Sequence, residues 1–208
     1  MSLIYGEGIN DSDYVVQLKE YQIIDGVKKQ VVVWTCPFYT RWKGVLERCY
    51  SPKWHKKFPT YKECTVHESW KVFSNFKAWM ENQDWEGKHL DKDLLLPGNK
   101  IYGPTTCVFV DPIVNLFLHT KTRKKTEWKV GVDLHKGRIR ARGMNEFGRN
   151  VHLGYFLTDD EAHNAYLKNK ARVASILASQ QTDPRISEAL LNRFSLQGDL
   201  IDVEFKEK

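Results

Sequence analysis

Residues 130–166 read VGVDLHKGRIRARGMNEFGRNVHLGYFLTDDEAHNAY, and this stretch decides the fold of the C-terminal half. Two glycine-containing turns separate three β-rich runs, which predicts three consecutive strands. A helix is expected next, because Thr158 can cap its N-terminus and Glu161, three residues later, completes a capping box. We therefore expect a three-stranded antiparallel sheet packed on one helix.

The second strand of this sheet carries Arg138, Arg140 and Arg142 at every second position. Alternation along a strand places the three arginines on one face, and Ile139 and Ala141 on the face toward the helix. Like charges in a row repel one another, so the row indicates an anionic partner. Because a β-ribbon fits the major groove of DNA, we expect this face to bind duplex DNA.

The charge of the chain is concentrated around the same strands. The net charge is +6, yet the segment from residue 121 to residue 149 holds ten basic and three acidic residues, so the rest of the chain is close to neutral. Such a concentration indicates a polyanion, although a solvated basic face is the alternative. The expected DNA-binding residues are Arg138, Arg140, Arg142, Lys136, Arg149, Lys129, Arg123 and Lys124.

The segment also resembles the Apetala-type DNA-binding domain of plant ethylene-response factors. The resemblance covers about 45 residues. It is carried by Gly131-Val132, by the basic second strand, by HLGYF at residues 152–156 and by the helix start with Ala165-Tyr166. It implies that the sheet face contacts DNA. The loop between the second and third strands departs from the plant pattern, so the resemblance implies nothing about base specificity.

A second informative stretch, residues 88–115, reads KHLDKDLLLPGNKIYGPTTCVFVDPIVN. A strand is expected to end at Asp91, a hairpin turn follows, and a helix begins near Pro112 and carries Asn115. His119 lies four residues after Asn115, which is one helical turn. A carboxylate and an amide held by a hairpin and a helix can share a divalent cation beside a phosphate.

This stretch resembles the ββα-metal core of phage HNH homing endonucleases, with RCY at residues 48–50 and TVHESW at residues 65–70 as further matches. The resemblance implies that Asp91 and Asn115 bind Mg²⁺ or Mn²⁺, and His119, on the same helix face as Asn115, could complete the cation's shell. Lys92 departs from the family, which has its general-base histidine there, and a lysine is protonated near neutral pH. His89, Lys92 and Asp93 are therefore the candidates beside Asp91 for the catalytic group near the attacking water. A degenerate site in which Asp91 and Asn115 only brace the hairpin is the alternative.

The cysteines leave two interpretations open. Cys64 and His67 have the two-residue gap of zinc ligands, and Cys49 and Cys107 could complete a structural Zn²⁺ site. Buried free thiols are the favoured alternative, because there is one short-spaced pair and no second.

The sequence predicts four regions in an α+β chain with an HNH-like ββα core. They are an N-terminal β-hairpin region at residues 1–35, turning at Asp25-Gly26, a nuclease core at 36–120, an Apetala-like domain at 126–178 and a C-terminal helix and tail at 179–208. Helices are expected over residues 37–50 and 67–83, with a loop at residues 51–64 between them. No apolar run is long enough to span a membrane and the start is no signal peptide, so a cytoplasmic location is expected, that of the host cell if a phage encodes the chain.

Together these features predict a metal-dependent HNH-type endonuclease of phage or mobile-element origin that cleaves duplex DNA. The first alternative is a catalytically degenerate DNA-binding protein, such as a regulator or an anti-defence factor, which Lys92 favours. An RNA-binding protein is a weaker alternative, since no stacking motif on the sheet supports it. The sequence leaves the oligomeric state open.

Overall fold

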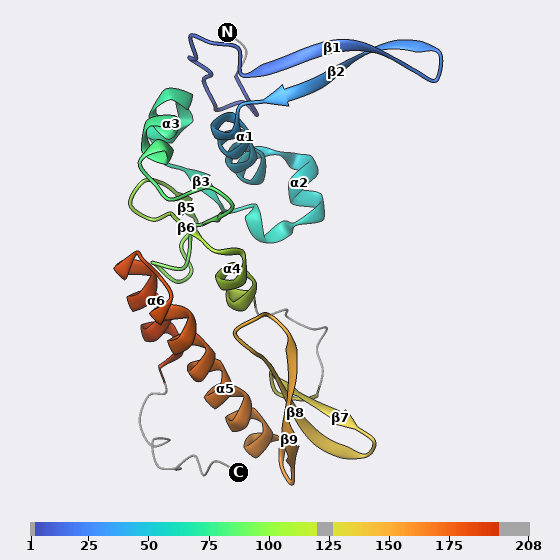
Figure 1. Ribbon diagram of the computed structural model, residues 1–208, viewed down its shortest axis with the longest axis vertical. Coiled ribbons are helices and arrows are strands. Elements are labelled where there is room, and N and C mark those ends of the chain that lie inside the picture. The colour runs from blue at the N-terminus through green and yellow to red at the C-terminus, as the bar shows by residue number, and fades with distance from the viewer. Residues whose placement is uncertain (1–2, 120–126, 196–208) are drawn as a thin grey trace. The chain divides into compact units, whose positions relative to one another are not determined.

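The computed structural model describes residues 3–119 and 127–195, which form an α+β structure. Contacts along the chain divide it into two compact units, residues 1–109 and 110–208. Each unit is described by itself below, with the element labels of Figure 1.

The first unit begins with the expected β-hairpin, formed by β1 (Gln17–Ile24) and β2 (Val27–Thr35). Asp25 and Gly26 both have positive φ, 52° and 74°, as a two-residue hairpin turn requires. The strands pair antiparallel with one bulge between Leu18 and Lys19. Figure 1 shows the hairpin extending away from the helices of its own unit.

Helix α1 (Pro37–Tyr50) begins at a proline, which suits the first helical position, and it buries Tyr39, Trp42, Val45, Leu46 and Cys49. The expected loop after it is wrong in part. Ser51 caps a short helix, α2 (Pro52–Lys57), through a hydrogen bond from the Trp54 amide to its Oγ, and a 3₁₀ turn, η1 (Pro59–Tyr61), follows.

The helix expected over residues 67–83 is interrupted. A 3₁₀ turn, η2 (Glu68–Lys71), precedes α3 (Phe73–Glu81), and Val72 between them is extended. The cause is a bridge to Ile9, whose amide donates to Lys71 O and whose carbonyl accepts from the Phe73 amide. The backbone groups of Lys71 and Phe73 therefore form hydrogen bonds with Ile9, a distant residue in the sequence, instead of continuing a helix.

Two small sheets complete the first unit and adjoin a core rich in aromatic residues. Strand β3 (Thr65–Val66) pairs in parallel with β5 (Ile101–Tyr102), and β4 (His89–Asp91) pairs with β6 (Val108–Val110). Strand β5 lies between β4 and β6 along the chain, so these two paired strands are not consecutive. The largest fully buried side chains of the core are Trp42, Trp70, Phe73, Phe76, Leu46 and Met80.

The second unit contains α4 (Pro112–Leu118), the strands β7 (Val132–His135), β8 (Arg138–Met144) and β9 (Asn150–Phe156), and the helices α5 (Asp159–Ser179) and α6 (Pro184–Phe194). The three strands form one antiparallel sheet in the order β7-β8-β9. The sheet, its helix and the capping box of Thr158 and Glu161 confirm the sequence prediction. Asp183 caps α6 through the Arg185 amide.

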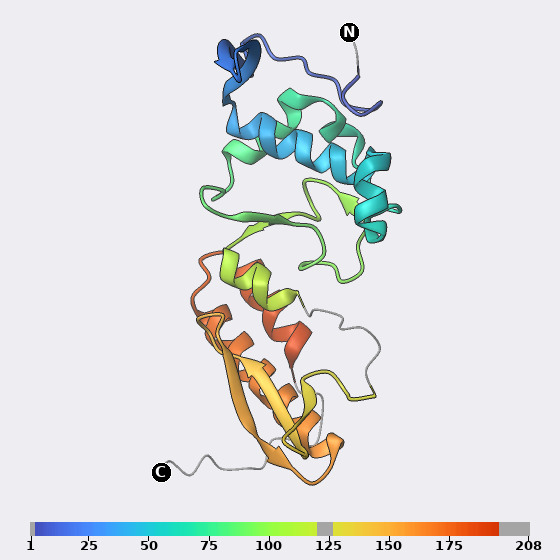
Figure 2. The same cartoon turned by 90° about the vertical axis from the view of Figure 1, so that its right-hand side faces the viewer.

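Helix α5 covers one face of this sheet, and the other face is open in Figure 2. Val132, Ala141 and Ala162 form the buried centre of the contact. Gly131 has φ +81°, and a Cβ there would lie 2.2 Å from Tyr166 Cγ, so no other residue fits between the strand and the helix.

Helix α4 lies in the second unit, although the sequence assigns it to the nuclease core. A Cβ at Gly148, in the turn between β8 and β9, would lie 3.1 Å from both Ile113 and Leu116 of α4. The Phe117 ring packs edge-on against Phe194 of α6, with centroids 4.9 Å apart. The division between residues 109 and 110 therefore precedes the boundary expected near residues 121–125, which fall outside the described residues.

Candidate nucleic-acid interface and candidate active-site turn

The open face of the β7-β8-β9 sheet carries the three arginines in a row, as predicted. Cross-strand pairing places Asp133 and Tyr155 beside Arg140, which lies between them on the central strand. His135 lies opposite Arg138, and His152 opposite Arg142. Ala141 points to the other face and is fully buried.

The carboxylate of Asp133 holds two of the arginines. Arg140 donates from Nε and Nη2 to its two oxygens at 2.9 and 3.0 Å, and Arg142 Nη2 lies 2.7 Å from Asp133 Oδ2. The hydrogen bonds that Arg140 donates to Asp133 raise the pKa of Arg140. One carboxylate thus orients two guanidinium groups, and the three arginines still outnumber it, so the face stays cationic.

Arg138 is held by an aromatic residue. Its guanidinium carbon lies 4.1 Å from the centroid of the Tyr155 ring. The hydroxyl of Tyr155 is hydrogen-bonded to His135 Nδ1 at 2.7 Å, and the His152 ring lies 4.7 Å from the Tyr155 ring. None of these three residues is among the predicted site residues. Alternation alone would place His152 and Tyr155, three residues apart, on opposite faces, and the bulge opposite Ala141 and Arg142 brings them to the same one.

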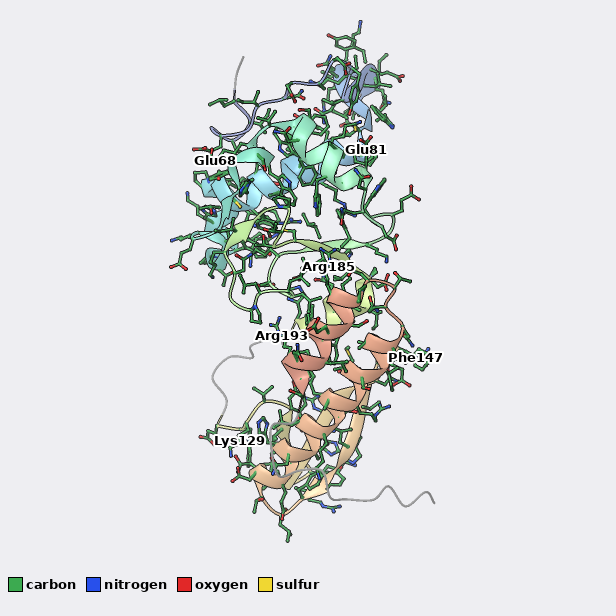
Figure 3. The ribbon with its side chains drawn as sticks, turned by 90° about the vertical axis from the view of Figure 1, so that its left-hand side faces the viewer. Glu68, Glu81, Lys129, Phe147, Arg185 and Arg193 are labelled. Carbon is green, nitrogen blue, oxygen red and sulfur yellow. The ribbon has the colours of Figure 1, made fainter. Side chains whose placement is uncertain are left out.

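The other described residues of the predicted DNA-binding set lie outside the strands of the sheet. Lys136 lies in the β7–β8 turn with φ 51°, and the Arg149 amide donates to the Asn145 side chain in the β8–β9 turn. Lys129, labelled in Figure 3, is paired with Asp160 at the start of α5. Arg123 and Lys124 lie outside the described residues.

The candidate active-site turn begins at Asp91, the last residue of β4. Its Oδ1 accepts two backbone hydrogen bonds, from Asp93 N at 2.9 Å and from Leu94 N at 2.7 Å. Burial and the nearby charge of Asp93 raise the pKa of Asp91 above its usual range. The strand ends here, so Asp93 does not continue it.

Lys92 is anchored within this turn. Its Nζ donates to Asp93 Oδ2 and to the carbonyl oxygen of Asn99, both at 2.9 Å, and its side chain is 12% exposed. The Asn99 side chain returns a hydrogen bond to the Lys92 carbonyl at 2.7 Å. Burial lowers the pKa of Lys92, but the hydrogen bond and charge of Asp93 outweigh it and raise the pKa. Lys92 is therefore a fixed cation near neutral pH.

The remaining candidates for a general base differ in exposure. His89 is exposed at the start of β4, two residues before Asp91 and so on the same side of the strand. The side chain of Asp93 is 42% exposed. Arg41 Nη2 donates to the carbonyl oxygen of Lys88 at 3.0 Å and fixes the backbone immediately before His89.

The metal ligands proposed from the resemblance fall in different units. Asp91 belongs to the first unit, and Asn115 and His119 belong to the second. Asn115 lies within α4, which is confirmed to begin at Pro112. His119 is the exposed C-cap residue after the last turn, and its amide donates to Asn115 O at 3.2 Å.

The chemistry of Asp91 fits a divalent cation in part. A nearby cation would offset the burial that raises the pKa of this carboxyl. Within residues 3–119 and 127–195, however, no three His, Cys, Asp or Glu side chains form a group that could hold a metal ion.

The possible zinc ligands form no such group either. Cys49, Cys64 and Cys107 are buried free thiols. Burial, and in Cys49 also the neighbouring Cys64, raises the pKa of Cys49 and of Cys107 to about 12. His67 caps η2 and its Nδ1 is hydrogen-bonded to Ser69 Oγ at 2.8 Å. These contacts favour core thiols over a structural zinc site.

Comparisons of the chain with protein-family models, with curated proteins and with solved structures found no match in any of the three. No described helix combines the length and the apolar character needed to cross a membrane.

Proposed function

We propose that the protein binds duplex DNA through the open face of the β7-β8-β9 sheet and cleaves it as a metal-dependent endonuclease of HNH type. The observation that carries the proposal is the arrangement on that face: Asp133 orients Arg140 and Arg142, and Tyr155 supports Arg138. Guanidinium groups fixed in this way lose little side-chain entropy when they bind phosphates or guanine edges.

The turn at Asp91 is the proposed catalytic part. Oδ1 of Asp91 accepts two backbone hydrogen bonds, which fix the carboxylate that would bind the cation. A bound Mg²⁺ or Mn²⁺ would stabilise the leaving 3′-oxygen and activate water. Asn115 joins the ligand set through the family resemblance alone, and His119 through its place four residues after Asn115. Because Lys92 is protonated, the base is His89 or Asp93.

A second function has an observation of its own in its favour. The ammonium of Lys92 already lies beside Asp93, and in a degenerate site it would replace the metal as the compensating charge. The protein would then bind DNA without cutting it. The two functions share the sheet and differ only in what Asp91 does.

Two variants separate the parts of the proposal. Arg140→Gln with Arg142→Gln should weaken DNA binding and cleavage together, whereas Asp91→Asn should abolish cleavage and leave the gel shift unchanged. Arg185→Gln is the matched control, since Arg185 is paired with Asp183 on α6, on the helical side of the unit (Figure 3). Full cleavage by Asp91→Asn would refute the catalytic assignment, and unchanged binding by the arginine variant would refute the interface.

A further inference from the structure

The β1–β2 hairpin exposes an unusual amount of apolar surface. Eight of its large apolar side chains are exposed, among them Ile23 at 80% and Val27 at 56%. An isolated two-stranded hairpin is at best marginally stable in water, and apolar surface of this kind marks an interaction site. Its charged residues, three lysines and two acids, nearly cancel, so charge does not single out a polyanion as its partner.

The two faces of the hairpin differ. Pairing and alternation give one face four rows, which run from the base to the turn as Leu18/Trp34, Glu20/Val31, Gln22/Lys29 and Ile24/Val27. We call this the apolar face, since five of its eight side chains are apolar. The opposite face has three apolar side chains among eight, and its rows are Gln17/Thr35, Lys19/Val32, Tyr21/Gln30 and Ile23/Lys28. Lys28 lies 4.8 Å from the Tyr21 ring, which it partly covers.

The apolar face is complementary to itself. Its first and last rows are wholly apolar, and the two rows between them hold Glu20 and Lys29. A second hairpin laid on this face with its strands reversed would place each apolar end row on the other, and the row of Glu20 on the row of Lys29. A two-fold interface requires such self-complementarity. Each contact between one residue of the first copy and another residue of the second copy is repeated with the two copies exchanged.

From this pattern we propose that the apolar face of the β1–β2 hairpin is a homodimer interface, on which the hairpin of a second copy packs face to face. The proposal is independent of the function argued above, because it requires neither DNA nor a metal ion. The hairpin is anchored at its base, where the Cys36 amide donates to Val16 O at 2.8 Å, so substitutions in its outer rows leave the core of the unit intact.

The test is analytical ultracentrifugation of the full chain without DNA, over a wide range of concentration. We expect a particle of twice 24.4 kDa that dissociates on dilution. Val27→Lys on the apolar face should give a monomer, whereas Ile23→Lys, one row nearer the base on the opposite face, should remain a dimer. Far-UV circular dichroism and a thermal melt of each variant check that the fold is retained.

A charge exchange tests the pairing of rows. Glu20→Lys alone should weaken the dimer by roughly fivefold, and adding Lys29→Glu should restore it. A wild-type chain that is monomeric at every concentration would overturn the proposal, as would a dimer that Val27→Lys leaves unchanged or that Ile23→Lys disrupts equally. A monomer whose DNA affinity falls in Val27→Lys would assign the hairpin to DNA instead and overturn it as well.

Discussion

The ammonium of Lys92 lies 2.9 Å from Oδ2 of Asp93, the carboxylate two residues after Asp91. The same ammonium also donates to the carbonyl oxygen of Asn99. One lysine thus closes the turn between β4 and β5, at the position where the HNH nucleases that this segment resembles have a general-base histidine. This relationship makes the role of Lys92 in stability separable from any role in cleavage.

Lys92→Met should destabilise the first unit by about 1–3 kcal/mol, because it leaves the Asn99 carbonyl and the Asp93 carboxylate without their buried donor. Urea unfolding measures the loss. Lys100→Met is the control, since Lys100 is exposed and its pair with Glu63 is long, at 3.8 Å, so it should change stability by less than about 0.5 kcal/mol. Equal effects of the two variants would contradict the anchoring role.

Asp91→Asn should make the protein more stable near neutral pH, by about 1 kcal/mol, because the amide oxygen can keep both backbone hydrogen bonds without a buried charge. Burial raises the folded pKa of Asp91 above its unfolded value. Its favourable contribution is therefore present below the unfolded pKa and is lost as the pH rises through the folded pKa. The advantage of the variant should vanish in acid, as measured by unfolding at several pH values.

Mg²⁺ provides an independent check on the same carboxylate. If Asp91 binds the ion, Mg²⁺ should raise the melting temperature of the wild type, because a ligand that binds only the folded state stabilises it. Asp91→Asn should lose this shift, and Asp84→Asn, at an exposed ion pair with Lys88, should keep it. Equal shifts in all three proteins would mean that the ion binds elsewhere.

The arginine row should govern how DNA affinity depends on salt. Arg140→Gln with Arg142→Gln removes two cations from the open face of the sheet, so log Kd should depend less steeply on log salt, with a slope smaller by about 2. Binding isotherms at several salt concentrations measure this slope. An unchanged slope would show that DNA contacts another surface.

Lys170 offers a pH test of the second unit. Its ammonium donates to Phe117 O and lies 3.8 Å from the Phe117 ring, and burial together with the charge of Arg193 lowers its pKa to about 8. A depressed pKa contributes stability above the unfolded value near 10.5, and this is lost as the pH falls through about 8.

The stability of Lys170→Met relative to that of the wild type should therefore be higher at pH 7 than at alkaline pH. The expected change in the stability difference is about 1–2 kcal/mol after allowance for the partial exposure of the side chain. Thermal or urea unfolding of both proteins across this range measures it. A stability difference independent of pH would show that Lys170 is not buried as described.

The sequence predicted most of the second unit, because its signals are local. Strand alternation, two turns and a capping box lie within residues 130–166, and each acts over a few residues. Even the pair of Asp133 and Arg140 could have been predicted, since a two-residue turn at Lys136-Gly137 brings the two strands into this register.

The features that could not be predicted depend on distant partners. The expected helix is interrupted at Val72 because the flanking residues, Lys71 and Phe73, form backbone hydrogen bonds with Ile9, which is far away in the sequence. The burial that raises the pKa of Asp91 results from packing of the whole first unit, which no local pattern reveals. Helix α2 is a different case: Ser51-Pro52 is a cap signal that the polar composition of the segment obscured.

Cleavage of supercoiled plasmid tests the central claim most directly. Wild type, Asp91→Asn, Asn115→Ala and the double arginine variant should be incubated with Mg²⁺, Mn²⁺ or EDTA, and DNA binding should be measured in parallel. We predict metal-dependent nicking by the wild type, none by Asp91→Asn or Asn115→Ala despite normal binding, and loss of both activities in the arginine variant. Intact plasmid in every lane, beside a clear gel shift by the wild type, would contradict the endonuclease and identify a DNA-binding protein.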